Sequence, residues 1–199
     1  MDDTFYRPPD RGKYLLEHEI EQLLDAANDL GEREWRFLRF MANTGVRPSE
    51  ARQIKVSDIY PNENRINVHT IKQKANAKGK IPEYTRDVDI DQNFAEDISE
   101  WIKNKSSDDR LFEISRYTMW RIFKRAIKKA RENGASLKDT YTLYSLRHSR
   151  AIYLLEWTKS DLIYVSRQLG HSSINVTKVY LHCLPSKREE YVKKCIKGF

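Results

Sequence analysis

The sequence has little of several features that define common classes of protein. Its two cysteines, Cys183 and Cys195, show no metal-type spacing with histidine, so we expect free thiols in a reducing compartment. No apolar run is long enough to span a membrane, and the N-terminal residues lack the pattern of a signal peptide. There is also no glycine-rich phosphate loop and no carboxylate cluster suited to Mg²⁺. We therefore expect a cytoplasmic protein with no metal, no cofactor and no membrane partner.

The composition is that of an ordinary folded domain. Charged residues make up 33% of the 199 residues and hydrophobic residues 39%, with four tryptophans and eleven tyrosines. This balance is typical of a globular chain, and the length suits one domain with a real core, or one domain plus a small appendage. The formal net charge of +7 favours a polyanionic partner, although many folded domains without such a partner are also mildly basic.

Hydrophobic spacing predicts an α+β fold that is mainly helical and has one small antiparallel β-sheet. Residues 65–71 and 86–90 alternate apolar and polar side chains as strands do, and the first of them would place Ile66, Val68 and Thr70 on one face. Elsewhere apolar residues recur at helical spacing. The predicted helices cover residues 17–28, residues 32–43, a segment from Pro48, a segment from Asp91 or Asn93, the stretch between Ser115 and Gly134, residues 142–157, the stretch between Asp161 and Gly170, and a last helix that follows Ser173 and carries Tyr180.

Two parts of the chain concentrate positive charge. The segment between the predicted strands is expected to form a long hairpin tip with four lysines: Lys72, Lys74, Lys78 and Lys80. The helix after Ser115 carries five cations opposite its apolar side, with no acidic residue among them: Arg121, Lys124, Arg125, Lys128 and Arg131. Such a face is usually just solvated, but five cations exceed what solvation needs, so we expect this helix to bind a nucleic-acid groove.

Four short motifs each contain one side chain of chemical interest. They are TGVRPSE with Arg47, YSLRHS with Arg147, LGHSS with His171 and VTKVYLH with Tyr180. Taken singly, such an arginine is usually an ion-pair residue, such a histidine a cap and such a tyrosine a packing residue. In this order and at these spacings the four together resemble the tyrosine recombinase (phage integrase) family, and the resemblance covers about Leu15 to Cys195.

The resemblance implies the tyrosine recombinase (DNA breaking-rejoining) fold and the DNA recombination or integration activity of mobile elements. Tyr180 would attack a phosphodiester, form a covalent 3′-phosphotyrosine bond and release a 5′ hydroxyl, so that strand exchange needs neither ATP nor metal. His171 would hydrogen-bond the scissile phosphate. Arg47 and Arg147 would grip that phosphate, a role that suits arginine because its planar guanidinium stays charged and makes bidentate contacts.

One position departs from the family pattern. Three residues before the second arginine most members have histidine, the expected proton acceptor, whereas this chain has Tyr144. A phenol with an ordinary pKa of about 10 can donate a hydrogen bond to the phosphate but is a poor base near neutral pH. The proton of Tyr180 would then go to water, to His171 or to the phosphate itself, or the enzyme would be slow.

The general acid and two further histidines are assigned through the same resemblance. The family uses a lysine of the hairpin to protonate the leaving 5′ oxygen. Lys72 follows the predicted strand directly and is favoured, with Lys74 second, while the remaining hairpin lysines would contact phosphates. His148 and His182 also match family positions, and we expect both to hold the catalytic helices through short hydrogen bonds.

The resemblance also divides the chain and suggests its partners. We expect an N-terminal arm over residues 1–14, a catalytic domain over residues 15–184 and a tail over residues 185–199 that can exchange between protomers. No room is left for the DNA-clamping domain that most members carry, so the chain would be a minimal recombinase or a catalytic fragment. The expected partners are double-stranded DNA and further copies of the chain, assembled on DNA as a tetrameric synapse.

Two other functions stay open at this point. A type IB topoisomerase shares the arginine, lysine, histidine and tyrosine set, but the LGH motif followed by VTKVYLH is more like a recombinase. A DNA-binding module that has lost its activity would account for Tyr144. The presence of Arg47, Arg147, His171 and Tyr180 argues against such a loss.

Overall fold

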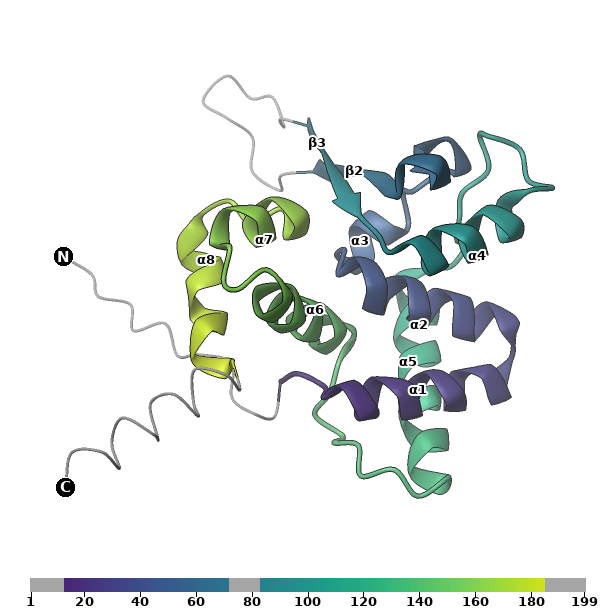
Figure 1. The fold of residues 1–199 in the computed structure, drawn as a ribbon. Helices are drawn as coiled ribbons and strands as arrows, with labels where there is room; N and C mark the ends of the chain where they lie inside the picture. The colour runs from purple at the N-terminus through teal and green to yellow at the C-terminus, as the bar shows by residue number, and fades with distance from the viewer. Residues whose placement is uncertain (1–12, 72–82, 185–199) are drawn as a thin grey trace, which may run out of the picture.

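The computed structural model describes residues 13–71 and 83–184, which fold into helices around one small sheet (Figure 1). The α-helices are α1 (Glu17–Leu30), α2 (Glu32–Thr44), α3 (Pro48–Ala51), α4 (Gln92–Ile102), α5 (Arg116–Glu132), α6 (Leu143–Trp157), α7 (Leu162–Leu169) and α8 (Ile174–Lys178). The strands are β1 (Ile59–Tyr60), β2 (Arg65–Ile71) and β3 (Glu83–Asp89), and three 3-10 helices are η1 (Val56–Asp58), η2 (Pro61–Glu63) and η3 (Val179–Cys183).

The sheet is antiparallel with the strand order β1-β2-β3, and Ile66 of β2 pairs with Val88 of β3. Ile66, Val68 and Val88 are buried against the helices, which confirms the predicted inward face of β2. Strand β3 begins at Glu83, earlier than the predicted start at Arg86. Its first residues are polar and show no alternation, so the sequence pattern did not indicate them. Strand β1 was missed because two residues are too short for a period to appear.

The predicted helices are present, and several of the residues that bound them act as caps. The Ser115 hydroxyl accepts from the backbone N–H of Thr118, and the Asp161 carboxylate caps α7 in the same way. Gly45 and Gly170 follow α2 and α7 in the left-handed conformation that closes a helix. The prediction for Tyr180 was wrong in one respect, because the helix that Ser173 caps ends at Lys178. The chain then tightens into η3, as helix ends often do, and Tyr180 lies in that 3-10 turn.

Two hydrophobic cores meet along α6, which Figure 1 shows between α2 and the pair α7 and α8. Its first half, with Leu143 and Leu146, belongs to the core that α1, α2, α4, α5 and the sheet share. Its second half, including Leu155, packs with α7 and with Tyr180 of η3. Because α6 is buried on several sides, a polar side chain near its middle, such as Arg147, lies between the two cores.

Some predictions fall outside the described residues. The hairpin lysines Lys72, Lys74, Lys78 and Lys80, the tail over residues 185–199 and nearly all of the arm over residues 1–14 belong to this group. The three domain boundaries therefore stay predictions. Among the described residues, none of the helices combines the length and the apolar content needed to cross a bilayer.

Candidate active site

The C-terminal end of α7 brings three arginines together. Three successive backbone carbonyls there each accept a hydrogen bond from a different guanidinium: Gln168 from Arg86 at 3.0 Å, Leu169 from Arg147 at 2.5 Å and Gly170 from Arg47 at 3.0 Å. The last carbonyls of a helix have no partner within the helix and lie at the negative end of its dipole. They therefore stabilise positive charges that come from β3, from α6 and from the residue before α3.

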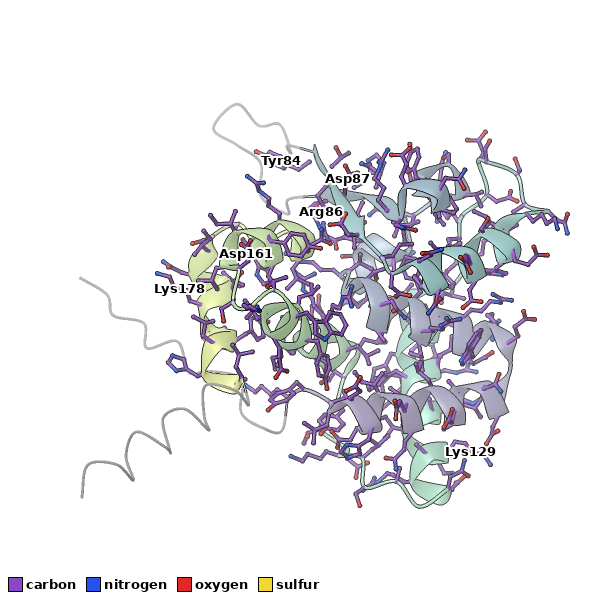
Figure 2. The ribbon with its side chains drawn as sticks, viewed as in Figure 1. Tyr84, Arg86, Asp87, Lys129, Asp161 and Lys178 are labelled. Carbon is purple, nitrogen blue, oxygen red and sulfur yellow. The ribbon has the colours of Figure 1, made fainter. Side chains whose placement is uncertain are left out.

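Gly170 is required at this junction for two reasons. Its φ of +65° is the left-handed conformation that ends α7 and that other residues rarely adopt. A Cβ at this position would also lie 2.8 Å from Cζ of Arg86. Figure 2 shows Arg86 where β3 approaches α7, so the glycine leaves room for the guanidinium to reach the end of the helix.

A single buried carboxylate, that of Glu50, connects two of the three arginines. It accepts from Nη1 of Arg47 at 2.7 Å, from Nη1 and Nη2 of Arg86 at 3.0 and 2.8 Å, and from the Thr70 hydroxyl at 3.1 Å. It also accepts from the backbone N–H of Arg47 at 2.8 Å, so Glu50 both pairs with cations and caps its own helix. Burial alone would raise the pKa of Glu50, but the hydrogen bonds and charges of Arg86 and Arg47 lower it to about 2.

Arg147 is only 5% exposed and is held from two directions. Besides its bond to Leu169, its Nη1 donates to the carbonyl of Gly45 at 2.7 Å, so the ends of α2 and α7 both fix the guanidinium plane. Burial, followed by the charge of Arg47, lowers the pKa of Arg147 to about 10, and the side chain stays charged at neutral pH. Among the described residues, one carboxylate, that of Glu50, hydrogen-bonds two of these three guanidinium groups, and the third donates only to backbone carbonyls. The resulting excess of positive charge suits an anionic ligand.

Tyr180 lies between two histidines. Its hydroxyl oxygen is 2.7 Å from Nδ1 of His148, and its ring is parallel to that of His171, with centroids 6.2 Å apart. The tyrosine is 3% exposed. Burial and the charge of Arg147 lower the pKa of His148 to about 4, so this imidazole is neutral at pH 7 and able to accept the phenolic hydrogen bond.

His171 is oriented by Thr177, whose hydroxyl oxygen lies 2.7 Å from Nδ1. Burial, with the charges of Arg147 and Arg47, lowers the pKa of His171 to about 3, so the ring carries one proton at neutral pH. When the Thr177 hydroxyl donates to Nδ1, that proton is on Nε2 and can be donated to a ligand. Thr177 is fully buried, so its own packing holds the hydroxyl that fixes this histidine.

The structure therefore brings Arg47, Arg147, His171 and Tyr180 together, as the resemblance implied. It adds Arg86, which the sequence analysis missed. Residues 86 and 88 lie two positions apart on β3 and therefore face the same side of the sheet, and Val88 is buried. A cation at such an inward-facing position was the sequence signal that could have identified Arg86.

Other predicted site residues stay predictions. Tyr144, in the first turn of α6, is 45% exposed and has no hydrogen-bond partner among the described residues. On α5, Arg121, Arg125 and Lys128 are exposed, whereas Lys124 is half-buried. Lys124 donates to the carbonyls of Asp139 and Tyr141 at 2.7 and 3.1 Å, so part of its role is structural. His182 is exposed and makes no hydrogen bond to the described residues, unlike His148.

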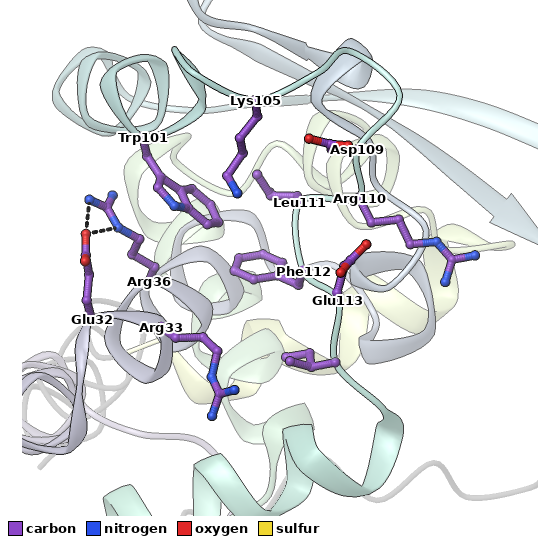
Figure 3. A pocket seen from close by; sticks show the side chains of 11 residues that line it. Glu32, Arg33, Arg36, Trp101, Lys105, Asp109, Arg110, Leu111, Phe112 and Glu113 are labelled. Atoms are coloured by element: carbon purple, nitrogen blue, oxygen red, sulfur yellow. Dashed lines mark hydrogen bonds and ion pairs between the residues drawn. The ribbon is translucent and has the colours of Figure 1, made fainter.

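A separate hollow of about 420 Å³ lies at the first turn of α2, near the end of α4 (Figure 3). Trp101 and Phe112 form part of its wall, and the pair Glu32 and Arg36 lies at its rim. It contains none of the residues that surround Tyr180, and its cations and acidic groups are mixed. Within residues 13–71 and 83–184, no cluster of three or more histidine, cysteine or acidic side chains could hold a metal ion.

The role of Arg86 gives a first prediction. Arg86→Ala should lower the free energy of unfolding by about 3 kcal/mol, the lower end of the cost of removing one partner of a buried ion pair, because Arg47 still contacts Glu50. Urea unfolding at pH 7 measures this. The matched control is Arg65→Ala on β2, whose ion pairs with Glu63 and Asp87 are more exposed and screened by solvent, so this variant should lose much less stability than Arg86→Ala.

Arg86→Ala should also change how the free energy of unfolding depends on pH. The pKa of Glu50 is about 2 in the folded chain and 4.5 ordinarily, so its contribution to stability is complete above pH 4.5 and is lost as the pH falls towards 2. Without Arg86 the folded pKa is higher, and less stability is lost over this interval. Equal losses in the wild type and Arg86→Ala would contradict the proposed role of this ion pair.

Comparison with known proteins agrees with this arrangement of residues. The sequence pattern of the phage integrase family matches residues 13–187, and the chain belongs to this family. It is 29% identical to the tyrosine recombinase XerA of Saccharolobus solfataricus, over 91% of this chain and 56% of that protein. It is 30% identical to XerC of Haemophilus influenzae, over 87% of this chain and 59% of that protein. The chain thus spans little more than half the length of these relatives.

Solved structures confirm the predicted fold. The crystal structure of XerA recombinase superposes with a TM-score of 0.69 and 26% identity, over 91% of this chain and 65% of that one. The catalytic domain of bacteriophage HP1 integrase gives a TM-score of 0.58 and 25% identity, over 90% of this chain and 93% of that one. The described residues therefore form a tyrosine recombinase catalytic domain.

Proposed function

We propose that this chain carries the catalytic centre of a site-specific DNA recombinase, which cleaves and rejoins double-stranded DNA through a covalent 3′-phosphotyrosine intermediate. The observation that carries the proposal is the position of Tyr180, between two neutral histidines and beside a cluster of three arginines with a single carboxylate. Membership of the phage integrase family supports the same activity.

Each group has a defined task in this reaction. Arg47 and Arg147 neutralise the non-bridging oxygens of the scissile phosphate, and His171 donates a hydrogen bond from Nε2. The Tyr180 oxygen attacks phosphorus in line with the leaving 5′ oxygen. The phosphotyrosine bond replaces a phosphodiester bond of similar energy, so rejoining needs no ATP.

The burial of Tyr180 implies a movement before attack. At 3% exposure almost none of the residue is accessible to a DNA duplex, so η3 has to shift when DNA binds. A short 3-10 turn has poorer hydrogen-bond geometry than an α-helix and is cheap to displace.

Recombination also requires self-association, because two DNA sites have to meet and each strand is cut by its own tyrosine. We infer a tetrameric synapse on DNA, with the exposed cations Arg121, Arg125 and Lys128 of α5 contacting phosphates. Lys74, Lys78 and Lys80 of the hairpin are assigned the same task from the sequence alone, and Tyr144 is assigned a hydrogen bond to the scissile phosphate.

The direct test is trapping of the covalent intermediate. A cognate site is found first by sequencing the DNA that stays attached to denatured protein after incubation with random-sequence duplexes. A duplex of that site, nicked near the cleavage point so that rejoining fails, should then accumulate a protein–DNA adduct on a denaturing gel in the presence of EDTA. Absence of an adduct at every selected site would argue for a DNA-binding module. Relaxation of supercoils without recombinant product would favour a topoisomerase.

The general acid gives a second prediction. If Lys72 protonates the leaving 5′ oxygen, Lys72→Ala should cleave a normal substrate about 10²-fold or more slowly, within the range for general acid catalysis. A substrate with sulfur at the bridging 5′ position should restore the rate, since a thiolate leaves without a proton. Cleavage assays of Lys72→Ala and Lys74→Ala on both substrates measure this, and selective rescue of Lys74→Ala would move the role to that residue.

A further inference from the structure

The hydroxyl of Tyr180 already has a basic partner in the structure. Nδ1 of His148 lies 2.7 Å from the phenolic oxygen, within the range over which a proton is transferred between a nucleophile and its base. His148 directly follows Arg147 on α6, so the helix that supplies a phosphate-binding guanidinium also positions this imidazole. From the sequence alone, His148 is expected only to hold the catalytic helices.

The other groups considered for this proton are less suitably placed. Tyr144 is 45% exposed and makes no hydrogen bond to the described residues, so nothing there directs it towards Tyr180. His171 uses Nδ1 to contact Thr177, and its ring lies parallel to the phenol at an interplanar angle of 11°. Its second nitrogen is assigned to the phosphate.

We propose that His148 is the general base that accepts the proton of Tyr180 during cleavage and returns it during rejoining, a role that rests on the proposed recombinase function. In the cleavage step a bond forms between the Tyr180 oxygen and phosphorus, and the phenolic proton moves to Nδ1 of His148. The bond between phosphorus and the 5′ oxygen breaks, and its electron pair leaves with that oxygen, which takes a proton from the general acid or from water.

The charges around His148 make its proton affinity depend on whether substrate is bound. It is half-buried, and the positive charges of Arg147 on its own helix and of Lys13 before α1 disfavour its protonated form, while neutral His171 and Tyr180 lie on its other sides. A phosphodiester held by Arg47 and Arg147 adds a negative charge that offsets these cations. The proton affinity of His148 then rises when DNA is bound, at the stage when the proton has to be taken up.

The experiment combines a change of the base with a change of the phenol. His148→Asn keeps a hydrogen-bonding group near the position of Nδ1 but cannot take up a proton. Single-turnover adduct formation on the nicked substrate should slow by about 10²-fold or more, the range for general base catalysis. With 3,5-difluorotyrosine at position 180, a more acidic phenol, the defect of His148→Asn should shrink by at least about tenfold. His18→Asn, at an exposed position of α1, is the matched control and should behave as the wild type.

The results separate this proposal from the proposed function. A wild-type adduct that His148→Asn forms at the same rate, or a defect that fluorination leaves unchanged, would overturn the role of His148 and leave the recombinase function intact. Absence of any adduct in the wild type would instead remove the proposed function. If His148→Asn does not fold, the pH–rate profile of the wild type decides. The acid limb expected from His148 stays in place on fluorination, and a limb that moves with the phenol pKa excludes His148 as the base.

Discussion

Tyr180→Phe is expected to abolish the covalent protein–DNA adduct and to leave DNA binding nearly unchanged. The substitution removes one oxygen atom, which is the proposed nucleophile, and keeps the ring that packs in the second core and stacks on His171. His148 loses its hydrogen bond to the phenol, which should lower the free energy of unfolding by only about 1 kcal/mol. Adduct formation is measured on a denaturing gel, and binding by mobility shift at a stated salt concentration.

The control for this prediction is Tyr164→Phe on α7. Its hydroxyl also donates a hydrogen bond to another side chain, that of Asp89 at 2.9 Å, so each variant loses one side-chain hydrogen bond. Tyr164→Phe should still form the adduct. An adduct that persists in Tyr180→Phe would remove Tyr180 from the nucleophilic role, whatever happens to the control.

Local signals in the sequence accounted for most of the fold. Caps such as Ser115 and Asp161 and stop residues such as Gly170 act within one helical turn, so their effects can be predicted without knowing the rest of the chain. The conformation around Tyr180, in contrast, could not be predicted from local signals. Nothing in the residues from Ser173 onwards distinguishes a continuing helix from the 3-10 turn that follows Lys178, because that choice depends on packing against α6.

The candidate site was predicted in part, for a similar reason. Arg47, Arg147, His171 and Tyr180 stand in motifs whose joint spacing can be recognised, whereas the contacts that hold them join residues far apart in sequence. The pairing of Arg86 with Glu50 and the approach of His148 to Tyr180 follow from the meeting of β3, α6 and η3 near the end of α7. The periodicity of a sequence does not indicate which distant elements come into contact.

Arg147→Ala should have the largest combined effect on activity and stability. Cleavage is expected to fall by at least about 10²-fold, the scale of losing one contact to a developing oxyanion. The free energy of unfolding should fall by about 2–4 kcal/mol, because the buried carbonyls of Gly45 and Leu169 both lose their donor. Single-turnover cleavage below the unfolding transition and urea unfolding measure the two effects separately.

Two further variants test what is specific to Arg147: one separates its charge from its geometry, and the other removes the second arginine of the site. Arg147→Lys keeps the positive charge but lacks the planar fork that serves two carbonyls at once, so it should recover little of the cleavage rate. Arg47→Ala removes a side chain that is 31% exposed and that donates to one carbonyl and to Glu50, which keeps its ion pair with Arg86. It should lose cleavage to a similar degree with a smaller loss of stability. In all three variants DNA binding should weaken much less than cleavage, since the other cations that we propose to contact phosphates, such as Arg121 and Arg125, are kept. If binding fell as much as cleavage, the two arginines would be anchors for DNA, and the stabilisation of the transition state would have to come from other residues.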